Sequence, residues 1–399
     1  MQKRLDMKKL TFLLLLALAA CEEIDHSGEW TEEPAAISLQ EVAQMLSALP
    51  IGSEQVGEVR DAVLASVGNG YDEEYTMADL FRAPGSGVGD AATKAPTKTY
   101  RTPLRELIGQ YLENRTKAGE TSSLTTDDLQ LSDVQIYWPW SEKEFPADEL
   151  PVMTFDPGDK STTNIGYRIL QDADGGRSVE ELIVDEDYAM HHPVWVVNRN
   201  EDSSYASLDL LRKLHPEWGS DGGALVVGPA KTGLQTKAGE PLRTLVLSTF
   251  VMRQHYDTWF AGASEFFIKL GAIDDFKAQT EEELRVYSPM VTDFMIVVRR
   301  SQLGMYRPFN AVLVSNWTDQ MERCALMITE DDGGTQTTWK AEGEVKIKSK
   351  TYGFGISIPF NSRDDIVWRG NISGRYFEQY NRLAGHFGDV DLTFEILER

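Results

Sequence analysis

Strict alternation of apolar and polar residues near the C-terminus is the feature that most limits how this chain can fold. Residues 339–348 alternate between small or apolar side chains and lysine or glutamate, and the same period recurs in 354–360 and 389–396. A period of two places successive side chains on opposite faces of a strand. The three segments therefore predict half-buried antiparallel strands with one face in a core and the other in solvent.

Further apolar runs extend this pattern over the last part of the chain. They lie at residues 243–252, 264–270, 292–299, 310–315 and 322–329. With about eight strands in all, and Asp331–Gly334 predicted as a hairpin turn, residues 241–399 predict an antiparallel β-sandwich. We expect a C2-like or immunoglobulin-like arrangement, which by itself implies no activity.

Helical periodicity dominates residues 37–125 instead. The region begins at a capping box formed by Ser38 and Glu41, and the last of its further predicted helices starts at Thr102. Glycine, proline and small polar residues make 84–99 the predicted linker within this region.

Residues 127–228 predict a small β-rich module. Alternation at 134–138 is followed by short apolar runs at 152–155, 182–184, 194–197 and 225–227. A second predicted linker joins this module to the sandwich at residue 241. The predicted fold class is α+β and mainly β, with a helical N-terminal part, a β-rich middle module and the C-terminal sandwich.

The first 20 residues predict a lipoprotein signal peptide. A basic end precedes the apolar run Leu10–Ala20, whose 11 residues are too few to cross a bilayer. Small residues then lead to Cys21, which predicts cleavage before this cysteine and lipidation of its side chain. Residues 21–36 follow as an acidic tether.

Cysteine usage and charge narrow the possible partners. The chain contains only two cysteines, so lipidation of Cys21 leaves Cys324 without an intramolecular partner. The net charge is −24, and it becomes −27 once residues 1–20 are removed with their four basic and one acidic side chains. Such a chain repels nucleic acid and anionic lipid headgroups. Membrane contact is expected through the lipid anchor, while neutral glycans, cations and proteins stay open as ligands.

Catalytic signatures are missing from the sequence. It contains no His-Glu-x-x-His motif, no Gly-x-Ser-x-Gly nucleophile elbow, and no serine followed three positions later by lysine. The missing motifs favour a protein without enzymatic activity. They do not exclude an active site assembled from residues that are distant in sequence.

Acidic doublets supply one candidate site. Asp274, Asp275, Asp364 and Asp365 fall in predicted loops of the sandwich, as do Asp331 and Asp332. Loops at one end of a sandwich can supply the oxygen ligands that calcium requires, so calcium is the one cofactor considered. The alternative is that these residues serve turns and helix caps on an acidic surface.

Aromatic residues supply a second candidate site. Tyr137, Trp138 and Trp140 lie at the end of a predicted strand, where exposed rings would stack on sugar faces. The alternative is that these rings pack between the middle module and a neighbouring part of the chain.

Several segments carry a resemblance to a known family. Residues 136–140, 256–266, 362–370 and 388–394 resemble those of uncharacterised surface lipoproteins of gut Bacteroidota, of the Bacteroides type. The acidic run after Cys21 is similar to the surface-export signal of such lipoproteins. The resemblance implies a β-rich body anchored in the outer membrane and facing the cell exterior, and it carries over no activity or site.

Together these features predict a lipid-anchored, surface-exposed binding or scaffolding lipoprotein of unknown ligand. A glycan-binding lipoprotein and a carboxylate-dependent hydrolase are the two alternatives.

Overall fold

The computed structural model describes residues 37–82, 98–119, 124–146, 148–158, 160–171, 176–200, 205–214 and 241–398. The chain divides into two units, Met1–Ala36 and Ile37–Arg399, and the described residues belong to the second. The predicted signal peptide, Cys21, the tether, most of both predicted linkers and the predicted strand at 225–227 lie outside the described residues.

Helices open the described part of the chain. They are α1 (Leu39–Ala48), α2 (Ser53–Gly68), α3 (Met77–Phe81), α4 (Leu104–Lys117) and α5 (Thr126–Gln130). The Ser38 side chain caps α1 by accepting a hydrogen bond from the backbone N–H of Glu41 at 3.3 Å. Such a cap satisfies one of the N–H groups that a helix start leaves unpaired. The predicted start of the first helix is confirmed.

The first sheet combines strands from both sides of residue 126. It runs in the order β1 (Glu74–Thr76), β2 (Val134–Tyr137), β6 (Val194–Arg199), β3 (Val152–Phe155), β4 (Thr163–Gln171) and β5 (Arg177–Asp185). All pairs are antiparallel except β3 with β6. A short helix, α6 (Glu186–His191), follows β5 directly.

Helices α1, α2 and α4 cover one face of this sheet. Val42 and Leu46 of α1 belong to the same buried cluster as Ile136 of β2 and Trp195 of β6. The predicted helical region 37–125 and the predicted β-rich module therefore share one hydrophobic core. Periodicity locates each element, but it does not show which elements bury their apolar faces together.

The opposite face of the first sheet is covered by a loop from the C-terminal part. Trp259 and Phe260, which lie between β7 and β8, pack with Tyr137, Val152 and Val196 in a separate buried cluster. The indole N–H of Trp259 also donates a hydrogen bond to the carbonyl oxygen of Thr162, at 2.9 Å. This loop ties the first sheet to the strands that follow.

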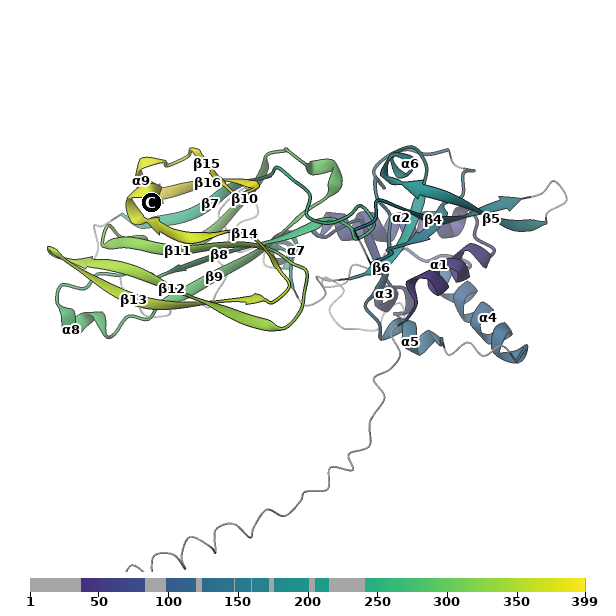
Figure 1. Cartoon of the computed structure of the whole chain (residues 1–399), viewed down its shortest axis with the longest axis horizontal. Coiled ribbons are helices and arrows are strands. Elements are labelled where there is room, and N and C mark those ends of the chain that lie inside the picture. The colour runs from purple at the N-terminus through teal and green to yellow at the C-terminus, as the bar shows by residue number, and fades with distance from the viewer. Residues whose placement is uncertain are drawn as a thin grey trace, which may run out of the picture. The chain divides into compact units, whose positions relative to one another are not determined.

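The C-terminal part is an antiparallel β-sandwich, as predicted (Figure 1). One sheet has the order β10 (Arg307–Val314), β7 (Arg243–Met252), β16 (Val390–Glu398) and β15 (Ala384–Phe387). The other has the order β13 (Lys350–Asn361), β12 (Gln336–Ile347), β11 (Met321–Glu330), β8 (Ser264–Ala272) and β9 (Met290–Val298), with β14 (Asp365–Ser373) also paired to β11. Short helices α8 (Glu281–Leu284), η3 (Arg300–Gln302) and α9 (Gly374–Gln379) lie in the connections.

Alternate residues of the two sheets meet in the sandwich core. Phe250 of β7, Phe266 and Ile268 of β8, and Leu392 of β16 belong to one buried cluster, which also contains Cys324. Each strand places every second side chain on this inner face, which is the arrangement that the alternation predicts. The fold is α+β and mainly β.

The β12–β13 hairpin packs against the outer face of the second sheet. Ile356 and Ile358 of β13 contact Ala325 and Met327 of β11 in a small separate cluster. In Figure 1 the hairpin lies on the side of β8 and β9 that faces away from β7 and β16. The hairpin thus adds a third layer to part of the sandwich.

The turn at Asp331–Gly334 differs from the predicted hairpin turn. It connects β11 to β12, but these strands pair only at the far end of β11, through Met321 and Arg323. At Glu330 the partners of β11 are β8 and β14 instead. The predicted hairpin turn is therefore wrong, because strand pairing depends on the packing of the whole sheet and not on the local turn residues.

Helix α7 (Leu208–Leu214) covers another part of the outer face of this sheet. Leu210 packs with Phe267 of β8 and with Met295 and Val297 of β9. None of the described helices is long and apolar enough to span a membrane.

Candidate functional site

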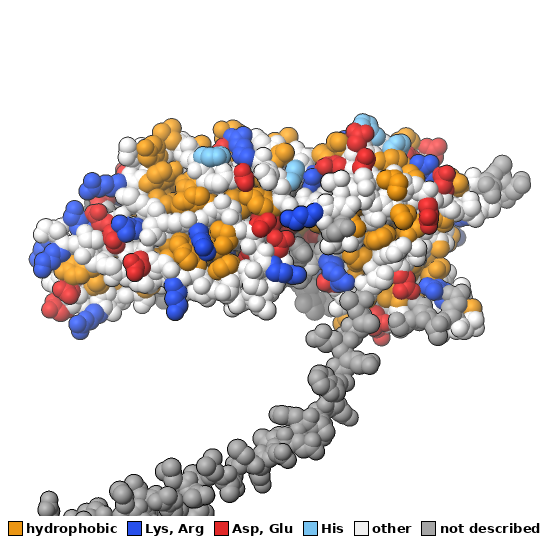
Figure 2. All heavy atoms as spheres, viewed as in Figure 1, with side chains coloured by type: hydrophobic (Ala, Val, Ile, Leu, Met, Phe, Trp, Pro, Cys, Tyr) orange, Lys and Arg blue, Asp and Glu red, His pale blue; other side chains and the backbone are white. Residues whose placement is uncertain are grey.

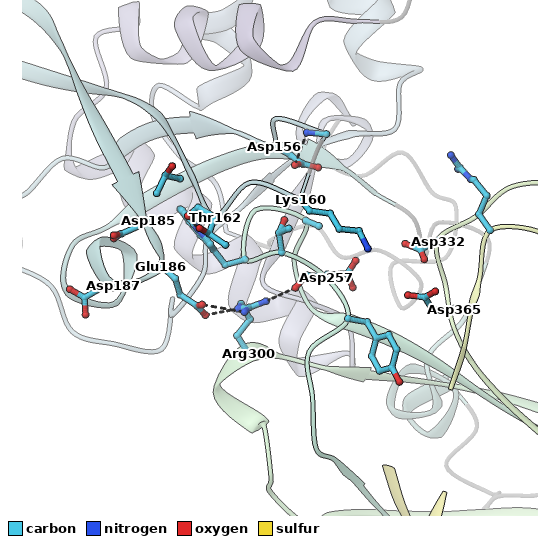
Figure 3. A pocket seen from close by; sticks show the side chains of 17 residues that line it. Asp156, Lys160, Thr162, Asp185, Glu186, Asp187, Asp257, Arg300, Asp332 and Asp365 are labelled. Carbon is cyan, nitrogen blue, oxygen red and sulfur yellow. Dashed lines mark hydrogen bonds and ion pairs between the residues drawn. The ribbon is translucent and has the colours of Figure 1, made fainter. Parts of the chain in front are cut away.

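A pocket of about 900 Å³ lies between the first sheet and one end of the sandwich. Its wall combines the loop between β3 and β4, the start of α6, the β7–β8 loop, η3, and the turns that precede β12 and β14. The charged side chains in the wall are Asp156, Lys160, Asp185, Glu186, Asp187, Asp257, Arg300, Asp332, Arg363 and Asp365. Figure 3 shows Asp185, Glu186 and Asp187 on one side and Asp332 and Asp365 on the other. The volume lies within the range typical of small-molecule sites.

The β7–β8 loop carries Asp257 into this pocket. Trp259 fixes the loop on the side of the first sheet, as described above. Further along the loop, the carboxylate of Asp72, which precedes β1 of the same sheet, accepts a hydrogen bond from the backbone N–H of Ala263 at 2.9 Å. Between these two positions Gly262 has a φ of +130°, a conformation that residues with a side chain rarely adopt. Residues 259–263 are therefore held on the first sheet, and Asp257 just before them is held through its own backbone carbonyl, which accepts a hydrogen bond from Arg300.

Arg300 joins η3 to α6 across the pocket. Its Nε lies 2.6 Å from one carboxylate oxygen of Glu186, and its Nη2 lies 3.2 Å from the other (Figure 3). Its Nη1 also donates to the backbone carbonyl of Asp257 at 3.2 Å. Two parallel contacts of this kind fix direction as well as distance. The cation is consequently engaged with Glu186 and with the backbone of the loop.

Three carboxylates converge at the inner wall of the pocket. One oxygen from each of Asp257, Glu330 and Asp332 lies within 4.8 Å of the others. Glu330 is fully buried, and neither of its carboxylate oxygens has a hydrogen-bond partner; Oδ2 of Asp257 is also buried without one. Such groups are costly to bury in ionised form.

The cost of burying a charge raises the pKa values of these carboxyl groups. Burial, followed by the neighbouring Asp257 carboxyl group, raises the pKa of Glu330 well above its usual range. Burial and the negative charges of Asp257 and Asp365 raise the pKa of Asp332 to about 6. Without a compensating cation, this part of the wall therefore retains protons at a pH where ordinary carboxylates are ionised.

Asp364 belongs to the turn just behind these residues. Its carboxylate accepts a hydrogen bond from the backbone N–H of Asn361 at 2.8 Å, while its other oxygen is buried without a partner. Burial and the nearby Asp331 raise the pKa of Asp364 to about 6. Asp365 lines the pocket itself.

The candidate calcium ligands do not form one site. Asp364 and Asp365 lie beside Glu330, which pairs with Phe266 near the start of β8. Asp274 and Asp275 follow the other end of β8, where Asp274 accepts hydrogen bonds from Ser315 Oγ at 2.7 Å and from the backbone N–H of Asn316 at 2.8 Å. Because β8 separates them, the two pairs cannot hold one ion. Asp331 and Asp332 are instead the doublet that joins Asp364 and Asp365.

The candidate aromatic residues are placed mainly inside the protein. Tyr137 and Trp138 are buried on opposite faces of the first sheet, in two different clusters. Trp140 is partly buried, has a φ of +62°, and has the Lys143 ammonium 4.8 Å from its ring centre. Tyr137 and Trp138 therefore present no ring face to solvent for stacking on a sugar.

Sequence reasoning did not single out Asp257, Glu330 or Arg300. The available signal was Glu330, which ends an apolar strand and begins a run of three acidic residues, Glu330 to Asp332. Asp257 lies far from it in sequence and reaches it only through the packing of the β7–β8 loop, and Arg300 joins the site only through its contacts with Asp257 and Glu186.

No protein-family model matches this chain, and neither the curated proteins nor the solved structures include a significant match.

Proposed function

We propose that this protein is a lipid-anchored binding protein of the outer membrane, facing the cell exterior, and that its ligand occupies the acidic pocket. The observation that carries the proposal is the pocket itself. It is of ligand size, and its lining contains seven carboxylates against three basic side chains.

The charge of the lining selects the class of ligand. Surplus carboxylates repel phosphorylated and acidic compounds, and they accept hydrogen bonds from hydroxyl groups. Thr162, Thr163 and Tyr256 add hydroxyl groups to the same wall. We therefore propose a neutral, hydroxyl-rich ligand, with neutral glycans as the class. On the face shown in Figure 2, basic side chains are interspersed with acidic ones, which gives no support to nucleic-acid binding.

A glycan array followed by calorimetry tests this proposal. The mature chain is prepared as Cys21→Ser, so that it carries no lipid, and is compared with Asp185→Asn/Asp187→Asn. Asp185 caps α6, and asparagine caps helices equally well, so this variant should stay folded. We expect at least tenfold weaker binding of the glycan selected by the array.

A matched control removes a carboxylate elsewhere. Glu282 is exposed on α8, beyond the end of β8 opposite to the pocket, and Glu282→Gln should bind like the parent. Failure of every neutral glycan to bind, or equal binding by the pocket variant, would contradict the proposal.

The membrane anchor is tested separately. The lipoprotein signal and Cys21 support it, and the resemblance to surface lipoproteins of gut Bacteroidota supports the outward orientation. A labelled fatty acid should be incorporated into the parent and not into Cys21→Ser, and protease added to intact cells should remove the parent. Protection from protease in intact cells would contradict surface exposure.

One observation favours a second candidate function, a carboxylate-dependent hydrolase. Asp332 lines the pocket beside Asp257, and its raised pKa of about 6 suits a general acid near neutral pH. Release of new reducing ends from the bound glycan, lost in Asp332→Asn, would support hydrolysis. Binding without any product would leave the protein as a binding protein only.

A further inference from the structure

We infer that Asp257, Glu330 and Asp332 form a binding site for a calcium ion at the inner wall of the pocket. This inference does not depend on the ligand proposed for the pocket, and the two can fail separately. It places calcium on residues different from the two acidic pairs that the sequence suggested.

The strongest support is the environment of Glu330. Its side chain is fully buried, and both of its carboxylate oxygens lack a hydrogen-bond partner among the described residues. A buried carboxylate in a native protein is normally paired, hydrogen-bonded or bound to a metal ion. Glu330 therefore needs either a proton or a cation, and the charged groups that act on it are the carboxylates of Asp257, Glu265 and Asp332.

The geometry suits a single ion bound by all three side chains. Ligand oxygens lie about 2.4 Å from calcium, so oxygens on opposite sides of one ion are about 4.8 Å apart. The three carboxylate oxygens lie within that distance of one another. Calcium accepts flexible arrangements of oxygen ligands, whereas magnesium demands near-ideal octahedral geometry.

The chemistry of the ligands also favours calcium. All three are carboxylates, and neither histidine nor cysteine contributes, which disfavours zinc and other softer ions. Asp257 and Asp332 also line the pocket, so water or hydroxyl groups entering from it can complete the coordination of the ion.

The fold holds each of these residues in place before any ion binds. Glu330 ends β11 and is held in register between Phe266 of β8 and Asp365 of β14. Asp332 follows in a turn in which the Asp331 carboxylate accepts a hydrogen bond from the backbone N–H of Gly333 at 3.0 Å. The backbone carbonyl of Asp257 accepts a hydrogen bond from Nη1 of Arg300 at 3.2 Å, which holds this residue of the β7–β8 loop. A preorganised set of ligands loses little entropy when an ion binds.

A shared proton is the competing explanation. The raised pKa of Glu330 shows that, without a cation, the cluster favours a proton. Calcium binding would release that proton, whereas a cluster that only shares a proton gives no response to calcium, so the two explanations differ in their response to calcium.

Calorimetry and thermal unfolding decide between them. The Cys21→Ser chain is treated with chelator, dialysed, and titrated with calcium chloride. We expect saturable binding with a dissociation constant of about 0.1–1 mM, the range of extracellular sites, and a melting temperature that rises when calcium is added and falls back when chelator removes it.

Two variants and a control test whether calcium binds at Glu330 and Asp332. Glu330→Gln should abolish the calcium-dependent rise in melting temperature, while its calcium-free melting temperature stays close to that of the parent, because a neutral amide replaces a carboxyl group that holds a proton when no cation is bound. Asp332→Asn should weaken calcium binding at least tenfold. Asp275→Asn, at the other end of β8, should respond to calcium like the parent.

Three results would overturn the inference. The first is the absence of any heat of binding and of any shift in melting temperature at calcium concentrations up to about 10 mM, well above the dissociation constants of the weakest extracellular sites. The second is an unchanged calcium response in Glu330→Gln or, if that variant does not fold, in Asp332→Asn. The third is an equal response to magnesium, which would overturn the assignment to calcium.

Discussion

Arg300 and Glu186 form a two-point ion pair that connects the sandwich to the first sheet. Arg300 follows β9, Glu186 opens α6, and their nearest contact is 2.6 Å. The Arg300 side chain is only 8% exposed, so solvent screens this pair much less than an ordinary surface pair. The same guanidinium holds the backbone of Asp257, so the pair also fixes one wall of the pocket.

Replacing Arg300 should destabilise the protein clearly. We expect Arg300→Ala to lower the free energy of unfolding by about 2–4 kcal/mol, because Glu186 and the Asp257 carbonyl both lose their partner. Arg300→Lys should recover only part of the lost free energy of unfolding, since lysine cannot make the two-point contact. Urea denaturation measures the free energy of unfolding of both variants. Glu180→Ala, which breaks the more exposed pair with Arg168, serves as control and should cost about 0–1 kcal/mol.

Trp259 should contribute more to stability than any polar contact of the same loop. It is buried against the first sheet, and its indole N–H is bonded to Thr162. We expect Trp259→Ala to cost about 3–5 kcal/mol in the free energy of unfolding, and Trp259→Phe to cost less because the ring is partly replaced. A loss below about 1 kcal/mol for the alanine variant would show that this loop does not bind the first sheet tightly in solution.

The absence of a side chain at Gly271 lets the β12–β13 hairpin pack on the sheet. A Cβ atom at Gly271 would lie 2.5 Å from a methyl group of Ile356, whereas one at Gly355 would meet nothing within 4 Å. We therefore expect Gly271→Ala to lower stability by about 1–3 kcal/mol, because Ile356 must shift. Gly355→Ala, in the same hairpin, is the matched control and should change stability little. Equal melting temperatures of the two variants would contradict the packing described here.

The elements of the sandwich were largely predictable because their signal is local. Alternation in residues 339–347 and 390–396 reports which side chains face a core, and β12 and β16 occupy those positions. Strand β15, with four residues, is too short to show a period, and β14 places partly exposed apolar residues such as Val367 and Trp368 next to each other.

The pocket was not predictable because it depends on relations between distant residues. Glu330 meets Asp257 only because β11 pairs with β8 and the loop before β8 folds back onto the first sheet. No local pattern reports such pairing. The acidic doublets were a correct signal of charge near the site, but sequence alone does not show that β8 separates Asp274 from Asp364.

Cys324 should be unreactive in the folded protein. Its side chain is fully buried in the sandwich core, and burial raises the pKa of its thiol, so almost no thiolate forms near neutral pH. In the Cys21→Ser chain we expect a thiol reagent to label less than about a tenth of the protein before unfolding and nearly all of it in denaturant, where a free thiol titrates near its usual value. Rapid labelling without denaturant would show that the core opens easily.

His255 should make the stability of the protein depend on pH below about 6.5. Burial, followed by the positive charge of Arg300, lowers the pKa of His255 from 6.5 to about 4, and Glu186 opposes this shift only in part. Because the unfolded chain binds this proton more readily than the folded one, stability from His255 is complete above pH 6.5 and is lost as pH falls toward 4.

The measurement compares the parent with His255→Gln between pH 7 and 5 in the presence of chelator. Asp332 and Asp364, whose pKa values are raised to about 6, act in the opposite direction, but they are common to both proteins and cancel in the difference. We expect the parent to lose about 1–2 kcal/mol more than the variant over this range, allowing for the partial exposure of the ring. An equal pH dependence of the two proteins would show that His255 reaches solvent in the folded state, and that the loop carrying Asp257 is more open than its contacts indicate.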